Sequence, residues 1–183
     1  LIPTYGDIVL DNKSIVTVPP HKRNIGMMFQ HYALFPHMSV ADNIAFPLQM
    51  RRMSKNKISE RVSWALDLVQ LSEFKNRRPH QLSGGQQQRV AVARAIVSKP
   101  SIVLADEPTG NLDSKQSAEI WSLLQQIARE QKKTILMVTH EAQGAAYADR
   151  VVVLKDGRVV GTLEPKGTTD AALVATGYQE LAG

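Results

Sequence analysis

The fold is decided by an apolar stretch that ends in two carboxylates and a proline, Ser101-Ile102-Val103-Leu104-Ala105-Asp106-Glu107-Pro108. A continuous apolar run of this length is typical of a strand buried on both faces of a parallel sheet. The strand must end before Pro108, because proline has no backbone N–H to donate to a sheet. Ligands of open α/β sheets bind beyond the carboxyl ends of the strands, so we expect Asp106 and Glu107 at a binding site.

The two carboxylates are expected to point to opposite sides, because successive side chains of a strand alternate. Asp106 is then placed to hold a hard cation, directly or through water, while Glu107 faces a reacting water. Taken alone, the pair is equally well interpreted as a strand that happens to end in two solvated acids. The rest of the sequence has to decide between these interpretations.

Two further apolar runs end in polar side chains suited to the same site. Residues 24–30 are expected to form a strand that ends at Gln30, whose amide can ligate Mg²⁺ or orient water without carrying a charge. Residues 134–140 are expected to form a strand that ends at His140, whose imidazole titrates near neutral pH. The alternative for Gln30 is a residue that merely ends its strand.

A helix with two glycines at its start precedes the acidic strand. Leu82-Ser83-Gly84-Gly85-Gln86 opens a helical pattern that continues to Val97, with Ser83 as the expected N-cap. Gly84 and Gly85 allow a phosphate to approach the backbone, and the N–H groups of the first turn attract anions. The alternative is an ordinary cap on a helix that packs inward. Asp113 is expected to cap the next helix.

Several other segments carry strong local signals. Two short antiparallel strands are predicted around the turn at 11–13, and Asp156-Gly157 predicts a hairpin. Ser39-Val40-Ala41-Asp42 is a capping box that starts a helix, and an apolar stripe predicts a second helix over 59–70. A short terminal helix is expected over 169–176.

These motifs together resemble the nucleotide-binding subunit of ATP-binding-cassette (ABC) transporters, over essentially the whole chain. The resemblance rests on Leu-Ser-Gly-Gly-Gln at 82–86, the acidic strand, Asn111-Leu112-Asp113 and the strand that ends in His140. It implies an α/β core like that of P-loop NTPases, with a mostly parallel sheet, flanking helices, a small antiparallel piece and a helical subdomain. It also implies ATP and Mg²⁺ as cofactors.

The resemblance assigns roles to individual residues. Glu107 would be the general base or water-polariser, and His140 would sense the γ-phosphate. Asp106 and Gln30 would hold Mg²⁺. Ser83, Gly84, Gly85 and Gln86 would contact the nucleotide bound to a second subunit. Asp113 would lie at the same nucleotide and take part in communication across the dimer.

The implied partners are a second ATPase subunit, in a homodimer or heterodimer, and transmembrane permease subunits. The implied location is cytoplasmic, peripheral on the inner face of the cell membrane. The apolar runs of the sequence are far below the roughly 18 residues that a membrane span needs.

One motif of the family is missing, because no G-x-x-x-x-G-K-[ST] occurs in the 183 residues. We therefore expect a fragment without the N-terminal strands, the P-loop and the first helix, inactive by itself. In the family that the chain resembles, Gln30 matches the glutamine of the Q-loop, and the helix that opens with residues 82–86 matches the signature helix. We divide this single partial domain into a β region up to the Q-loop (1–30), a helical subdomain (31–81) and a part with the signature helix, the acidic strand, the histidine strand, the hairpin and the last helix (82–183).

The subfamily is left open by two conflicting stretches. The sequence of residues 105–113 is most similar to that of lipoprotein-release and macrolide-export ATPases, whereas residues 35–48 are more similar to importer ATPases. The sequence therefore does not decide the substrate or the direction of transport.

Charge and composition weigh against a nucleic-acid partner. The net charge is +5, but acidic residues are interspersed among the basic ones, and there are only four Phe, four Tyr and two Trp. A soluble ABC ATPase of DNA repair or chromosome maintenance would carry a long coiled coil between Gln30 and Leu82, where this chain has only 51 residues without sustained heptads. A second alternative is a non-catalytic remnant that serves as an interaction module.

Overall fold

A three-stranded parallel sheet forms the centre of the molecule. The structure is a computed structural model and describes residues 3–182. The strands β3 (Ile25–Met28), β4 (Ile102–Asp106) and β5 (Thr134–Val138) lie side by side in the order β3-β4-β5. Met28 pairs with Ala105 and Ala105 with Met137, so the three strands end at the same edge of the sheet. The three predicted strands are confirmed, although β3 and β5 each end two residues before the predicted ends at Gln30 and His140.

One face of this sheet packs against helices. Met28, Val103 and Ala105 are at most 1% exposed and belong to the same core cluster as side chains of α3 (Gly84–Ile96) and α4 (Ser114–Glu130). Complete burial of a side chain the size of Met28 or Val103 contributes about 1.5–3 kcal/mol. Gly26 of β3 is required, because a Cβ there would overlap the carbonyl oxygen of Ala95 in α3. The close approach of α3 therefore depends on a residue without a side chain.

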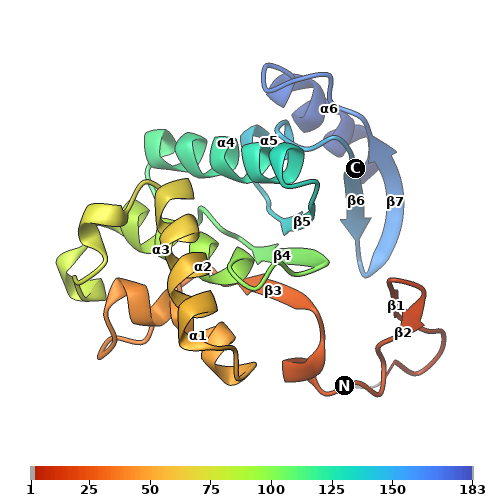
Figure 1. Cartoon of the computed structure of the whole chain (residues 1–183). Helices are drawn as coiled ribbons and strands as arrows, with labels where there is room; N and C mark the ends of the chain where they lie inside the picture. Colours follow the sequence, from red (N-terminus) through yellow and green to blue (C-terminus); the bar gives the residue numbers. More distant parts are fainter. Residues whose placement is uncertain (1–2, 183) are drawn as a thin grey trace.

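Two helices between β3 and α3 form a separate layer beside α3. They are α1 (Val40–Met50) and α2 (Lys55–Leu68), and both pack on each other and on α3 (Figure 1). The predicted cap of α1 is confirmed, since Ser39 Oγ accepts a hydrogen bond from the N–H of Asp42 at 3.0 Å. Short 3-10 turns cover Pro20–Lys22, Ser72–Phe74 and Pro79–Gln81.

Antiparallel pieces flank the parallel sheet. β1 (Val9–Leu10) pairs with β2 (Lys13–Ser14), and β6 (Val151–Lys155) pairs with β7 (Arg158–Leu163). The predicted Asp-Gly hairpin is confirmed, because Asp156 and Gly157 have φ values of 51° and 75°. The short helix α5 (Ala142–Ala145) follows β5.

The last helix is longer than predicted. Helix α6 covers Ala171–Ala182, whereas the sequence predicted a short helix over 169–176. The difference has a packing cause, because α6 lies on the β6–β7 hairpin (Figure 1). A Cβ on Gly161 of β7 would lie 2.5 Å from Leu181, and a Cβ on Gly177 would lie 2.8 Å from Leu163. Glycines on both elements therefore allow a contact that local propensity does not reveal.

Residues 3–182 contain no helix whose length and apolar character would allow it to cross a bilayer.

Candidate functional site

The ends of β4 and β5 bring Glu107 and His140 together. Oε1 of Glu107 lies 2.8 Å from Nδ1 of His140. The carboxylate can only accept, so Nδ1 carries the shared hydrogen and Nε2 remains on the outer side of the ring. The backbone N–H of Glu107 donates to the carbonyl of Val138 at 3.0 Å, which continues the ladder by one residue. The predicted meeting of these two residues at one sheet edge is therefore seen in the structure.

The electrostatics of the pair favour a protonated imidazole. The hydrogen bond to Glu107 raises the pKa of His140, and the attraction of the same carboxylate raises it further, with a smaller contribution from Glu141. The His140 side chain is 76% exposed, whereas that of Glu107 is 22% exposed. Oε2 of Glu107 is buried and has no hydrogen-bond partner among residues 3–182. This oxygen is therefore an acceptor that lacks a donor among the described residues, which is uncommon for a buried polar atom.

Strand alternation does not set the direction of Glu107, contrary to the argument from sequence. The strand ends at Asp106, and Glu107 adopts a left-handed conformation with φ of 45°. Its direction is fixed instead by the contact with His140. Asp106 is exposed at the end of β4.

Gln30 lies against the loop that follows Glu107. Its backbone carbonyl accepts a hydrogen bond from Nδ2 of Asn111 at 2.9 Å. A Cβ on Gly110 would lie 2.8 Å from Nε2 of Gln30, so the amide packs directly on this glycine. The Q-loop and the loop after the acidic strand are therefore in contact.

The residues present fit a partly hydrated Mg²⁺ rather than a closed protein cage. Mg²⁺ commonly keeps several waters and is bound through one or two carboxylates together with substrate phosphates. Asp106 offers one exposed carboxylate, and Gln30 offers an amide oxygen. No group of three or more His, Cys, Asp or Glu gathers into a metal site within residues 3–182. The roles of Asp106 and Gln30 as ligands stay predictions.

The start of α3 has the predicted cap. Ser83 Oγ accepts from the N–H of Gln86 at 3.3 Å, and Oε1 of Gln86 accepts from the N–H of Ser83 at 3.0 Å. The Gln86 side chain is thereby folded back onto the helix end. A Cβ on Gly84 would lie 3.1 Å from the Tyr32 hydroxyl, so this glycine also serves internal packing.

The N-terminus of α4 lies beside that of α3. Asp113 Oδ1 accepts from the N–H of Gln116 at 2.8 Å, which confirms its predicted role as N-cap. A Cβ on Gly85 would lie 3.1 Å from Oε1 of the same Gln116. The structure therefore groups Ser83 to Gln86 with Asp113, as two neighbouring helix ends that both offer N–H groups.

Sequence reasoning missed the residues that hold these loops. Arg94 of α3 donates to the carbonyls of Ala33 and Tyr32, at 2.6 and 2.9 Å. Both acceptor residues have positive φ, 48° and 58°, so the arginine stabilises a strained turn just after Gln30. Burial lowers the pKa of Arg94. No local signal could have identified this contact, because its partners lie about 60 residues away.

A second missed residue connects α3 to the acidic strand. Gln88 is fully buried, and its Nε2 donates to the carbonyl of Pro108. Its Oε1 has no partner among residues 3–182. The signature helix is thus bonded to the residue that follows Glu107.

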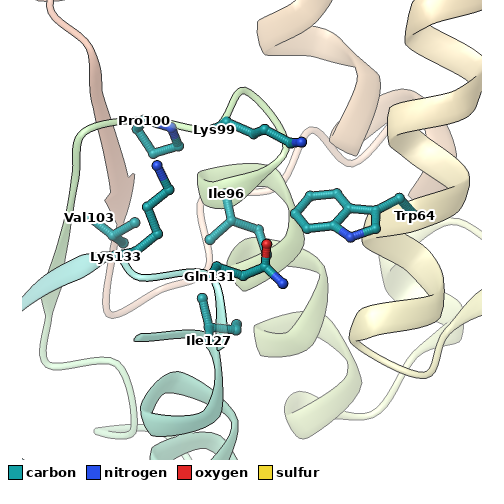
Figure 2. Close-up of a pocket in the computed structure, with 8 residues that line it drawn as sticks. All are labelled: Trp64, Ile96, Lys99, Pro100, Val103, Ile127, Gln131 and Lys133. Carbon is teal, nitrogen blue, oxygen red and sulfur yellow. The ribbon is translucent and has the colours of Figure 1, made fainter. Parts of the chain in front are cut away.

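A hollow of about 190 Å³ lies at the other end of the sheet (Figure 2). Its wall includes Pro100, which precedes β4, and Lys133, which precedes β5. Figure 2 shows Lys99 reaching toward Trp64 of α2, with its Nζ 5.7 Å from the ring centre. No predicted site residue lines this hollow. The candidate site is therefore the opposite edge, where the strands end.

Comparison with known proteins identifies similar sequences. The sequence model of the family described as "ABC transporter" matches residues 1–110. A spermidine/putrescine import ATP-binding protein PotA from Bacillus cereus is 46% identical over 165 residues, which is 90% of this chain and 50% of that protein. The protein of the same name from Marinobacter nauticus is 49% identical over 158 residues, 86% of this chain and 42% of that protein. The chain spans about half the length of the curated relatives it matches.

Solved structures with the same fold are dimeric cassettes. The ATP-binding cassette MJ0796, in a dimeric post-hydrolysis state bound to ADP and Pi, has a TM-score of 0.77 and 36% identity. The match covers 91% of this chain and 76% of that one. A second dimeric structure of the same protein, MJ0796, described as a bacterial ABC transporter cassette, gives a TM-score of 0.77 and 37% identity. The predicted fold class, an α/β ATPase core with small antiparallel pieces, is confirmed.

Proposed function

Since the chain belongs to the ABC transporter family, we propose that it is part of a subunit that hydrolyses ATP to energise transport by membrane partners. The observation that carries this proposal is the contact between Glu107 and His140 at the carboxyl edge of the parallel sheet. A half-buried carboxylate paired with an imidazole is suited to general base chemistry. The site lies where ligands of open α/β sheets bind.

Each residue contributes a defined chemical step. Oε1 of Glu107 is held by His140, while the unpartnered Oε2 polarises the attacking water. The exposed Nε2 side of His140 is free to donate to a phosphate oxygen. MgATP, when bound, would supply the transferable phosphoryl group and most of the charge neutralisation. Asp106 and Gln30 are the residues that would hold the metal.

The neighbouring starts of α3 and α4 support a second role in a dimer. The backbone N–H groups of Gly84 and Gly85 lie at the positive end of a 13-residue helix, between the capping residues Ser83 and Gln86, and Asp113 lies beside them. We propose that this surface contacts the nucleotide on a partner ATPase subunit, in a homodimer or heterodimer. The dimeric state of the similar cassettes supports this.

The names of the relatives favour import over export as the direction of transport. They agree with the importer-like residues 35–48 rather than with the exporter-like sequence of residues 105–113. Relatives from several species, 45–49% identical, are spermidine/putrescine import proteins. We infer import of a polyamine-like cation, with permease subunits as membrane partners and a peripheral position on the cytoplasmic face. Substrate uptake by cells with and without the gene tests this inference.

The P-loop segment, and the division into 1–30, 31–81 and 82–183, stay predictions. We expect a P-loop within a few dozen residues upstream of Leu1, and sequencing of the coding region tests this. Without that loop the 183-residue chain is expected to hydrolyse no ATP, because the P-loop backbone and lysine supply most of the hydrogen bonds to the phosphates. A start codon directly before Leu1 would instead favour the non-catalytic remnant.

Glu107→Gln tests the proposed mechanism in a complete subunit, meaning this chain together with its P-loop. The amide keeps the shape but cannot take a proton, so turnover should fall at least about a hundredfold while ATP is trapped in a stable dimer. Steady-state hydrolysis and size-exclusion chromatography with ATP measure both effects. Glu130→Gln, on the exposed end of α4, is the matched control. Unchanged turnover of Glu107→Gln would remove Glu107 from the mechanism.

A further inference from the structure

A partly buried hydrogen bond connects the two loops that carry Glu107 and His140. Thr109 follows Glu107 by two residues, and Glu141 follows His140 directly. Thr109 Oγ1 donates to Oε1 of Glu141 at 2.7 Å, and Thr109 is only 2% exposed. This bond therefore joins the segments just beyond the two functional side chains.

The local roles that these residue types usually play do not explain the bond. Glu141 occupies the N-cap position of α5, but its side chain makes no capping hydrogen bond to that helix. Thr109 takes part in its own turn through its backbone carbonyl, which accepts from Leu112 N–H at 2.9 Å. Each of the two side chains therefore bonds to the other rather than to its own loop.

The backbones on either side are fixed as well. The N–H of Glu141 donates to Oγ1 of Thr139 at 3.0 Å, and the N–H of Gly110 donates to the carbonyl of Glu107 at 3.2 Å. Glu107 itself has φ of 45°, a conformation that persists only where its surroundings hold it. A bond between the two loops supplies such a restraint.

We propose that Thr109 and Glu141 are positioning residues, whose hydroxyl–carboxylate bond keeps Glu107 and His140 within hydrogen-bond distance for ATP hydrolysis. The proposal rests on the proposed function. Loss of the Thr109 hydroxyl would also leave the Glu141 carboxylate without this donor, in a half-buried position. The two loops would then shift relative to each other, and the general base would lose its orientation.

Four variants of the complete subunit separate this role from simple packing. Thr109→Val removes the hydroxyl at nearly constant volume, whereas Thr109→Ser keeps it. Glu141→Gln keeps an acceptor oxygen, whereas Glu141→Leu does not. Thr134→Val, at the exposed start of β5, is the control for a Thr-to-Val exchange elsewhere in the sheet.

Two readouts are needed. The side-chain ¹⁵N signals of His140, recorded without nucleotide, report the hydrogen on Nδ1 and its bond to Glu107. Steady-state kinetics together with an independent ATP Kd separate turnover from binding. Thr109→Val should shift the His140 signals toward those of a free ring and lower kcat by roughly ten- to a hundredfold, with unchanged Kd, because small displacements of catalytic groups have effects of this size. Thr109→Ser and Thr134→Val should behave like the parent protein.

The proposal is wrong if Thr109→Val keeps the parent His140 signals and kcat, or if Thr109→Ser loses as much as Thr109→Val. If Thr109→Val does not fold, the Glu141 pair decides: Glu141→Gln should retain the contact and Glu141→Leu should lose it, and equal behaviour of the two overturns the proposal. If the complete subunit without substitutions hydrolyses no ATP, the proposed function is refuted. The His140 signals would still test the positioning contact.

Discussion

The two faces of the β3–β4–β5 sheet have similar composition but opposite environments. On the face that packs on helices, Met28, Val103 and Ala105 are at most 1% exposed. On the other face, Met27 is 46% exposed, and Leu136 and Val138 of the edge strand β5 are each 55% exposed. Strands that are apolar on both sides are typical of sheets that are buried on both faces. The comparison shows that residues 3–182 cover one face and leave the other open.

The two faces should differ most in the loss of stability that follows when an apolar side chain is replaced by a charged one. Val103→Asp places a carboxylate where the parent side chain is 0% exposed, and should cost about 3–5 kcal/mol, a large fraction of the roughly 5–15 kcal/mol by which an ordinary domain is stable. Leu136→Asp, on the neighbouring strand, should change stability far less because the side chain remains in water. Urea unfolding followed by circular dichroism measures both. Similar losses for the two variants would show that the open face is covered in solution.

A second test asks whether the open face drives self-association of the 183-residue chain. Exposed apolar side chains on an edge strand attract other copies. We expect the parent chain to associate or aggregate, and the double variant Leu136→Lys/Val138→Lys to shift toward the monomer mass of 20.2 kDa in light scattering. Met50→Lys, which replaces an isolated residue 65% exposed at the end of α1, is the control. If Met50→Lys had the same effect, a general gain in solubility would explain both.

The smallest expected effect is the pH dependence of stability that comes from His140, at the carboxyl edge of the sheet. Its pKa is raised above the ordinary value of 6.5, chiefly by Glu107, so the folded state holds the proton more tightly than the unfolded chain. The pair therefore stabilises the fold below about pH 6.5, as long as Glu107 is ionised, and this contribution is lost as pH rises through the folded pKa. Solvent screening keeps it small.

An NMR titration measures this pKa directly. Glu107→Gln should return the pKa of His140 toward 6.5, whereas Glu141→Gln should lower it only slightly, since Glu141 is the weaker cause. Equal shifts in the two variants would contradict the contact seen between Nδ1 and Oε1.

The helix caps and strand ends could be predicted from sequence because they depend on short-range physics. Ser39, Ser83 and Asp113 each bond to an N–H three residues further on, so their geometry is complete within one helical turn. The apolar runs that end in Gln30, Glu107 and His140 likewise located the strand ends to within two residues, and parallel strands bring their carboxyl ends to one edge.

The extension of α6, the left-handed conformation of Glu107 and the contacts of Arg94, Gln88 and Thr109 were decided only by the tertiary structure. These contacts join residues 20 to 62 positions apart in the sequence, and they form only after the helices have packed on the sheet. The open face has the same origin. The continuous apolar runs determined that both faces of the strands are suited to burial, but which face is buried depends on which helices the folded chain can bring against it.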